Sequence, residues 1–172
     1  FLCLPLDLPP MPLYPDHLKE RIIPQVLFEA LLEKYNGQKR TPITGTTRTA
    51  THIVWTLPQT LVFVVRRFTH NTLLGEKNTT IVEFDETLDM APYLHPEAPT
   101  QPTDYRLAAV VKHDGNPEDG TYSTYALNKG NGRWFELQDM DVKEVMMPLI
   151  KVSDIYLLAY ERVAARPEGK SH

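Results

Sequence analysis

Proline is the residue type that most restricts how this chain can fold. Fifteen prolines are spread along its 172 residues, and each fixes its own φ angle and removes a backbone donor. This content argues against a bundle of long helices and favours short elements. The apolar residues between the prolines mostly alternate with polar ones, as in half-buried strands.

We therefore expect an α+β fold that is mostly antiparallel β, with one main helix. The helix is predicted over 24–35, after a short turn at 17–22, because Pro24 is tolerated in a first turn and Asn36-Gly37 ends a helix. LVFVVRRF, 61–68, predicts a strand buried on both faces. Further strands are expected at 1–8, 79–85, 105–113, 121–128, 133–138 and 155–163, with extended chain at 41–57 and a loop at 91–103.

Composition limits the classes of function. Hydrophobic residues make up 42% of the chain, charged residues 23%, and the net charge is −4, which fits a globular domain without the basic excess of a nucleic-acid-binding surface. No apolar run reaches the roughly 18 residues of a membrane span. The N-terminal FLCLPLDLPP lacks the features of a signal peptide, and a single cysteine, Cys3, fits a reducing compartment. We expect an intracellular protein with neither nucleic acid nor membrane as a partner.

One domain is expected over 1–163, followed by a polar tail at 164–172. The first four residues, FLCL, have the character of the middle of a strand. The chain is therefore expected to be a fragment of a longer protein.

Few residues have the spacing of a catalytic or metal site. The six histidines do not combine with other ligands at metal-binding spacings, so no metal and no other cofactor is expected. NKGNG, 128–132, favours a hairpin turn over a phosphate loop, because no helix follows it. His113-Asp114 ends a strand, where His113 is either a general base or a residue that caps the turn. Cys3 lies among leucines and is expected to be buried and unreactive.

The stretch EDGTYSTYAL, 118–127, has the alternation of a half-buried strand that Gly120 opens. Thr121 is the first side chain it presents, and a hydroxyl is no base near neutral pH. Aromatic residues nearby are expected to be mostly core, with one or two lining a peptide groove: Tyr122, Tyr125, Trp134, Phe135, Tyr156 and Tyr160.

Five segments, in order, resemble the catalytic domain of the ubiquitin-specific proteases, which are papain-like deubiquitinases. The family first has an apolar strand that runs from Leu-Pro to Arg-Phe, and then a Lys and a strand before Leu-Asp. A strand from Tyr-x-Leu to His-x-Gly follows, and after it a Gly-His-Tyr strand before a Trp and an acidic pair. The last motif is Tyr-x-Leu-x-Tyr-Glu. The matching segments here are LPQTLVFVVRRF (57–68), KNTTIVEFDETLDMAPYL (77–94), YRLAAVVKHDG (105–115), GTYSTYALNKGNGRWFELQDMDV (120–142) and YLLAYER (156–162).

The resemblance implies an antiparallel palm sheet formed by 61–68, 79–85, 105–113, 121–128, 133–138 and 155–163, with short fingers and no thumb. It also implies two altered catalytic positions. Thr121 stands where the family has its general-base His, and Gln138 where it has the Asp or Asn that orients that His. The adjacent acidic residue is kept as Asp139. The surrounding frame is kept as Gly120, Tyr122 and Trp134, and His113 matches a family residue that is not the base.

Other family features are missing. The Asn-x-Gly-Asn-Thr-Cys pattern of the nucleophile is not found, and 36–56 lacks the cysteine pairs that bind zinc in the fingers. A palm without a thumb is expected to expose an apolar surface, which a partner or a second copy would cover. The loop 91–103 and the turn 114–120 match the two loops that flank the ubiquitin tail. The residues expected to bind there are Tyr122, His113, Asp114, Gly120 and Trp134.

Three functions stay open. The first is an inactive domain that binds ubiquitin, a ubiquitin-like protein or another partner. The second is a scaffold subunit of a larger assembly that has lost ubiquitin binding. The third is part of an active cysteine deubiquitinase whose thumb lies outside this chain.

Overall fold

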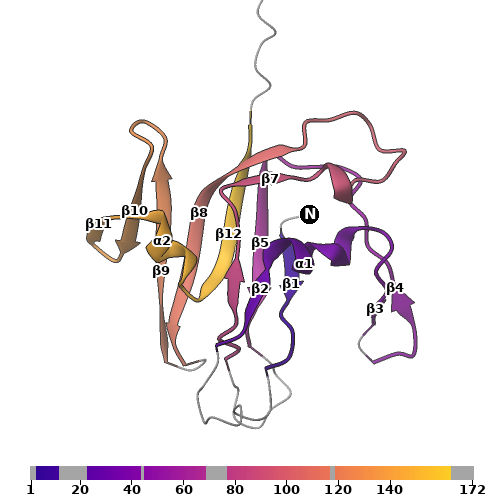
Figure 1. The fold of residues 1–172 in the computed structure, drawn as a ribbon, viewed down its shortest axis with the longest axis horizontal. Coiled ribbons are helices and arrows are strands. Elements are labelled where there is room, and N and C mark those ends of the chain that lie inside the picture. The colour runs from indigo at the N-terminus through magenta and orange to yellow at the C-terminus, as the bar shows by residue number, and fades with distance from the viewer. Residues whose placement is uncertain (1–2, 12–22, 44, 69–76, 117–118, 164–172) are drawn as a thin grey trace, which may run out of the picture.

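The computed structural model of the chain describes residues 3–11, 23–43, 45–68, 77–116 and 119–163. One large sheet dominates (Figure 1), and its strands follow the order β1-β5-β12-β8-β9-β10-β11. Neighbouring strands are antiparallel except β1 and β5, so the predicted fold class is confirmed. The bounds are β1 Leu4–Asp7, β5 Thr60–Arg66, β12 Ile155–Arg162, β8 Asp104–Gly115, β9 Gly120–Asn128, β10 Arg133–Gln138 and β11 Asp141–Val145, with β7 (Thr87–Asp89) paired to the start of β8.

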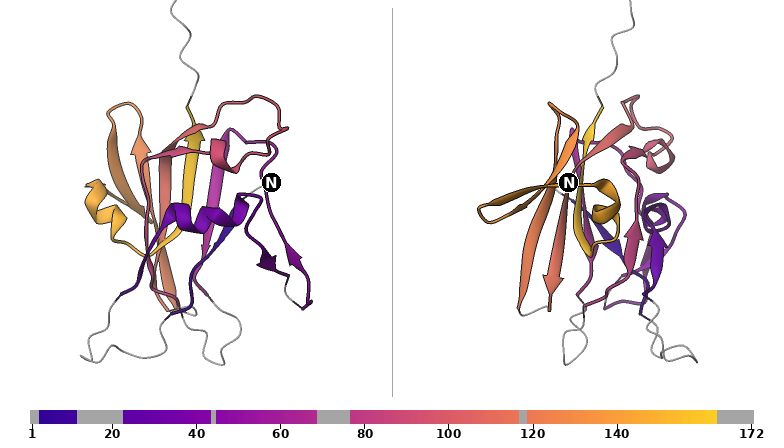
Figure 2. Two further views of the ribbon diagram at one scale, coloured as in Figure 1. Left: turned by 45° about the vertical axis from the view of Figure 1, so that its right-hand side comes forward. Right: turned by 60° about the vertical axis from the view of Figure 1, so that its left-hand side comes forward.

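A second layer covers one face of this sheet (Figure 2). It contains α1 (Phe28–Leu32), the 3-10 turn η1 (Glu33–Tyr35) and a parallel pair formed by β2 (Gln25–Leu27) and β6 (Ile81–Glu83). Phe28 meets Phe63 of β5 edge to face at 5.0 Å and stacks on Tyr160 of β12 at 6.0 Å. All three rings are buried, so α1 is held mainly by its apolar face.

The main helix is shorter than predicted. Residues 25–27 are extended because the chain pairs with β6 from Pro24 onward, where the Ile81 amide donates to the Pro24 carbonyl at 2.9 Å. The end of the helix is as predicted: Asn36 Oδ1 accepts from the amides of Gln38 and Lys39, and Gly37 has a φ of 74°.

The strand predicted at 79–85 was placed in the wrong sheet. Only Ile81–Glu83 forms a strand, β6, and it pairs with β2 in the covering layer. The prediction for 61–68 was also partly wrong, because Leu61, Phe63 and Val65 are fully buried whereas Val62 and Val64 are half-exposed. Strands β7 and β11 and the helix α2 (Met147–Lys151) were not predicted. β11 lacks an alternating apolar pattern, and the other two are very short.

The extended chain predicted at 41–57 contains only two short strands, β3 (Thr41–Pro42) and β4 (Thr49–Ala50), which form an arm beside α1 (Figure 1). The predicted loop 91–103 contains one 3-10 turn, η2 (Ala91–Tyr93). The predicted turn 17–22 and the tail 164–172 lie outside the described residues. No helix in the described ranges is long and apolar enough to cross a membrane.

Candidate functional site

The candidate site lies where β8 ends and β9 begins. The register pairs Gly115 with Gly120, Asp114 with Thr121 and His113 with Tyr122. Thr121 is exposed, and Tyr122 beside it keeps about half of its surface, 52%, in contact with solvent.

His113 is sealed into this corner. Only 2% of its surface is exposed, and its ring lies edge to face against Phe68 at 5.1 Å and Tyr122 at 4.8 Å. Burial lowers the pKa of His113, and the positive charge of Lys77 lowers it further. A neutral imidazole without solvent access is a packing residue. The capping interpretation of His113 is also incomplete, because its buried Nδ1 has no hydrogen-bond partner among the described residues.

Gly120 is required by the position of that imidazole. A Cβ placed on Gly120 would lie 2.0 Å from His113 Nε2 and 2.9 Å from the carbonyl oxygen of Asn116. The backbone therefore passes directly over the ring, and a larger residue at 120 would push either His113 or the turn away.

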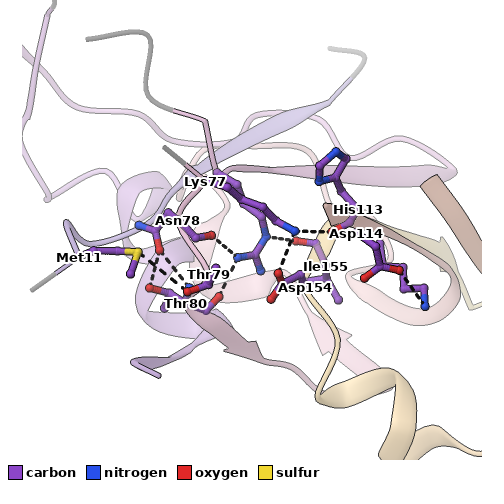
Figure 3. Close-up of polar contacts among 11 residues, drawn as sticks. Met11, Lys77, Asn78, Thr79, Thr80, His113, Asp114, Asp154 and Ile155 are labelled. Atoms are coloured by element: carbon purple, nitrogen blue, oxygen red, sulfur yellow. Dashed lines mark hydrogen bonds and ion pairs between the residues drawn. The ribbon is translucent and has the colours of Figure 1, made fainter. Parts of the chain in front are cut away.

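A buried cation network holds the other side of the corner (Figure 3). Arg67 is fully buried and donates from Nε to the Ile155 carbonyl at 2.6 Å and from Nη1 to the carbonyls of Asn78 and Thr80 at 2.7 and 2.9 Å. Burial lowers its pKa, and the carboxylate of Asp154 opposes that effect. These bonds fix the start of β12 against the chain before β6.

Lys77 joins this network to His113. Its Nζ lies 2.9 Å from the Asp154 carboxylate and donates to the His113 carbonyl at 2.5 Å. The side-chain amine thus positions the end of β8, from which Thr121 and Tyr122 are arranged by the register of β9.

Gln138 and Asp139 lie at the same end of the sheet as Thr121. The pairing of β9 with β10 reaches Thr124 and Leu137, so Gln138 is one residue beyond it and Thr121 three. Asp139 has a φ of 51° and opens a two-residue turn into β11. Trp134 was expected to bind a partner, but it is buried within β10 and belongs to the core.

The comparisons with known proteins agree with this geometry. The sequence profile described as ubiquitin carboxyl-terminal hydrolase matches residues 14–160. The chain belongs to that family.

Two relatives of known name match nearly the whole chain. Ubiquitin carboxyl-terminal hydrolase 39 of Homo sapiens is 38% identical over 167 residues, which are 94% of this chain and 30% of that protein. The probable mRNA-splicing protein ubp10 of Schizosaccharomyces pombe is 32% identical over 171 residues, 94% of this chain and 34% of that protein. The chain therefore spans about a third of the length of these relatives.

Solved structures share the fold. A SAGA deubiquitinating module of Ubp8, Sgf11, Sus1 and Sgf73 bound to ubiquitin aldehyde aligns with a TM-score of 0.71 at 22% identity, covering 96% of this chain and 36% of that chain. An essential yeast splicing factor aligns with a TM-score of 0.66 at 24% identity, covering 95% of this chain and 37% of that chain. At these identities the likeness shows the fold alone.

Within this ubiquitin hydrolase fold, two predictions about the site were wrong. The loop 91–103 precedes β8, whereas the turn 114–120 follows it, and twelve extended residues separate the two by roughly 40 Å. They cannot flank one narrow groove. Cys3 is exposed, not buried, and it lies just before β1, outside the pairing of β1 with β5. It remains at the edge opposite the strands that carry Thr121 and Gln138.

Sequence reasoning counted Tyr122 and Tyr156 among the aromatic residues near the hairpin but did not place Phe68 against His113. Phe68 and Tyr156 lie 6.2 Å apart, and Tyr156 lies 5.5 Å from Tyr122. The signal was present in part, since the Arg-Phe and Tyr-x-Leu motifs contain Phe68 and Tyr156, but motif order does not reveal that they meet.

One face of the main sheet is left open by the described residues of this chain. A single row of paired residues crosses all seven strands on the side away from α1, and each is half-exposed or exposed: Pro5, Val64, Leu157, Val111, Thr124, Leu137 and Val142. We call these residues the open row. A sheet face that stays in water is normally polar, and no described element covers this one (Figure 2). It has the character of a binding surface.

Proposed function

We propose that this chain is a non-catalytic ubiquitin-hydrolase-type domain that binds proteins within an mRNA-splicing assembly. One observation carries the proposal. The family position of the general base is Thr121, which has no titratable nitrogen, and the nearest described histidine, His113, is buried beneath Tyr122.

The other described histidines do not replace the base. His52 packs against Tyr35, and His95 against Trp55, both beside the short arm of β3 and β4. Gln138 stands where the family has the Asp or Asn that orients the base, so a second position of the catalytic set is changed as well. This counts against an active deubiquitinase that obtains its thumb from outside these residues.

The open row supports a binding role. Apolar side chains that remain in water on a sheet face gain free energy when a partner covers them, about 25 cal/mol for each Å². We propose that a protein partner covers this face, with a second copy of the chain as an alternative occupant. The splicing context is taken from the names of the ubp10 relative and the yeast splicing factor, and it implies an intracellular location.

The decisive experiment separates binding from catalysis. A splicing extract is depleted of the protein and supplied with variants of it. Thr121→Ala combined with Gln138→Ala is expected to restore splicing as well as the wild type does, whereas Val111→Asp in the open row is expected to fail. Loss of function in the Thr121 and Gln138 variant, with its fold intact, would contradict the proposal.

Ubiquitin or a ubiquitin-like protein is the second candidate partner, because Tyr122 remains exposed at the corner where the family frame is kept. Isotope-labelled chain is titrated with ubiquitin and followed by NMR. Shifts at 114–116 and 119–122 that disappear in Tyr122→Ala, but persist in the equally exposed Trp55→Ala, would establish this site. The absence of shifts at about millimolar ubiquitin would mean a binding free energy weaker than about −4 kcal/mol. That result would favour a scaffold role without ubiquitin binding.

A further inference from the structure

The two edges of the main sheet differ in their capacity to pair with another strand. At one edge, β1 contains Pro5, which has no N–H to donate. At the other edge, β11 contains no proline and no bulge, and four of its five residues are exposed. An uncovered strand of this kind is a template for another strand.

The outward backbone groups of β11 are those of Val142 and Glu144. Gln138 and Asp141 close the two-residue turn, so they exchange hydrogen bonds, and the pattern then alternates along the strand. The N–H and C=O groups of Val142 and Glu144 point away from β10, and the described residues supply no hydrogen bond to them.

We propose that β11 pairs antiparallel with β11 of a second copy of this chain, centred on Val142. In this register Val142 faces its own copy, and Asp141 of each chain faces Lys143 of the other. The register is symmetric, so both opposite-charge pairs form at once, as in an isologous two-fold interface. Cross-strand pairs of opposite charge and of β-branched residues both stabilise a sheet.

The neighbouring registers are unfavourable. A pairing centred on Lys143 would set two lysines against each other, and one centred on Glu144 would do the same with two glutamates. An edge lysine ordinarily prevents pairing with another strand. Here Asp141 lies two residues from Lys143 on the same side of the strand. In the Val142 register alone, Asp141 of one chain neutralises the charge of Lys143 of the other.

The rest of the sheet supports the same arrangement. Lys112 lies 3.0 Å from Glu136, which is paired with Lys143 in the register of β10 and β11. Asp141 of the second chain would continue this alternation of charge. On the other side, Val142 ends the open row next to Leu137, so pairing would join the open rows of two chains. This surface is the edge of the sheet, and it does not depend on the proposed splicing role.

The test uses sedimentation of the 172-residue chain with two single variants. Asp141→Lys puts lysine against lysine twice in each dimer, and Lys143→Asp puts aspartate against aspartate twice. Each is expected to weaken self-association at least about tenfold relative to the wild type. An equimolar mixture of the two variants restores both opposite-charge pairs and is expected to associate again. Glu97→Lys, an exposed change of the same charge as Asp141→Lys, is the matched control and should associate like the wild type.

Hydrogen exchange gives a second measurement that needs no variant. The amides of Val142 and Glu144 are expected to become protected as the wild-type concentration rises, while exchange of the Glu97 amide, which donates to His95 Nδ1, is expected to stay unchanged. Self-association that Asp141→Lys leaves unchanged would overturn the proposal, because another surface would then be responsible. A monomer at every concentration, with unprotected β11 amides, would also overturn it and would leave the edge to a strand of a different protein.

Discussion

The two faces of the main sheet are made by alternate residues of the same strands, yet one face is buried and the other is exposed. Leu4, Phe63, Leu158, Val110 and Tyr125 form one row across five strands, and none is more than 7% exposed. The open row uses the residue next to each of these in the same strand, and its members stay partly exposed. Both rows are apolar except for Thr124 in the open row, so the difference comes mainly from the covering layer of α1, β2 and β6, not from the strands themselves.

The strongest way to break the covered face is to remove the ring that α1 packs on. Phe63→Ala deletes contacts with Phe28 and Tyr160 and is expected to lower the free energy of unfolding by about 3–5 kcal/mol. Denaturant titration followed by circular dichroism measures the change. A loss below about 1 kcal/mol would mean that α1 is not held by this cluster.

Gly120→Ala tests the corner at the end of β8 where His113 is buried. The added methyl would overlap the His113 ring, which Phe68 and Tyr122 confine, so a loss of about 1–3 kcal/mol in unfolding free energy is expected. The double variant with His113→Ala should recover part of that loss, since it removes the atom that the methyl meets. If the two losses simply add, the close approach is not the cause.

A matched pair of substitutions sharpens the comparison directly. Val65→Thr places a hydroxyl on the buried face and is expected to cost about 1–3 kcal/mol, whereas Val64→Thr makes the same change on the open row and is expected to stay within about 0.5 kcal/mol. Thermal unfolding of both variants checks the difference. Equal losses would show that the open face is covered in the protein as purified.

The smallest effect expected is a pH dependence from His113. Its folded-state pKa lies below the ordinary value of 6.5 because burial disfavours the charged ring. The unfolded chain therefore binds more protons than the folded chain, and stability falls as pH drops below about 6.5. Unfolding measured from pH 7.5 to pH 5 should show this slope in the wild type and a flatter one in His113→Phe. An unchanged slope in that variant would assign the effect to other groups.

Local pattern was sufficient for much of the fold. Alternation at 105–113, 121–128 and 133–138 predicted β8, β9, β10 and the hairpin, because side chains in a strand change face at every residue. The order of the motifs predicted the family, which the sequence profile confirms. The altered base at Thr121 stays a prediction from the motif, in which Gly120 and Tyr122 on either side match the family.

Tertiary structure decided what alternation leaves undetermined. A strand pattern does not say which sheet a strand joins, so 79–85 was assigned to the main sheet although Ile81–Glu83 pairs with β2. Apolar neighbours in the sequence do not guarantee burial, as the exposed Cys3 shows. Conversely, His113 lies beside a turn but is buried, because Phe68 and Tyr122 pack against its ring. The sequence by itself determined the family and most strands of the main sheet. Only the packing of α1, β2 and β6 against one side determined which apolar row became the core and which remained a surface, because hydrophobic burial depends on what lies opposite a side chain and not on the side chain alone.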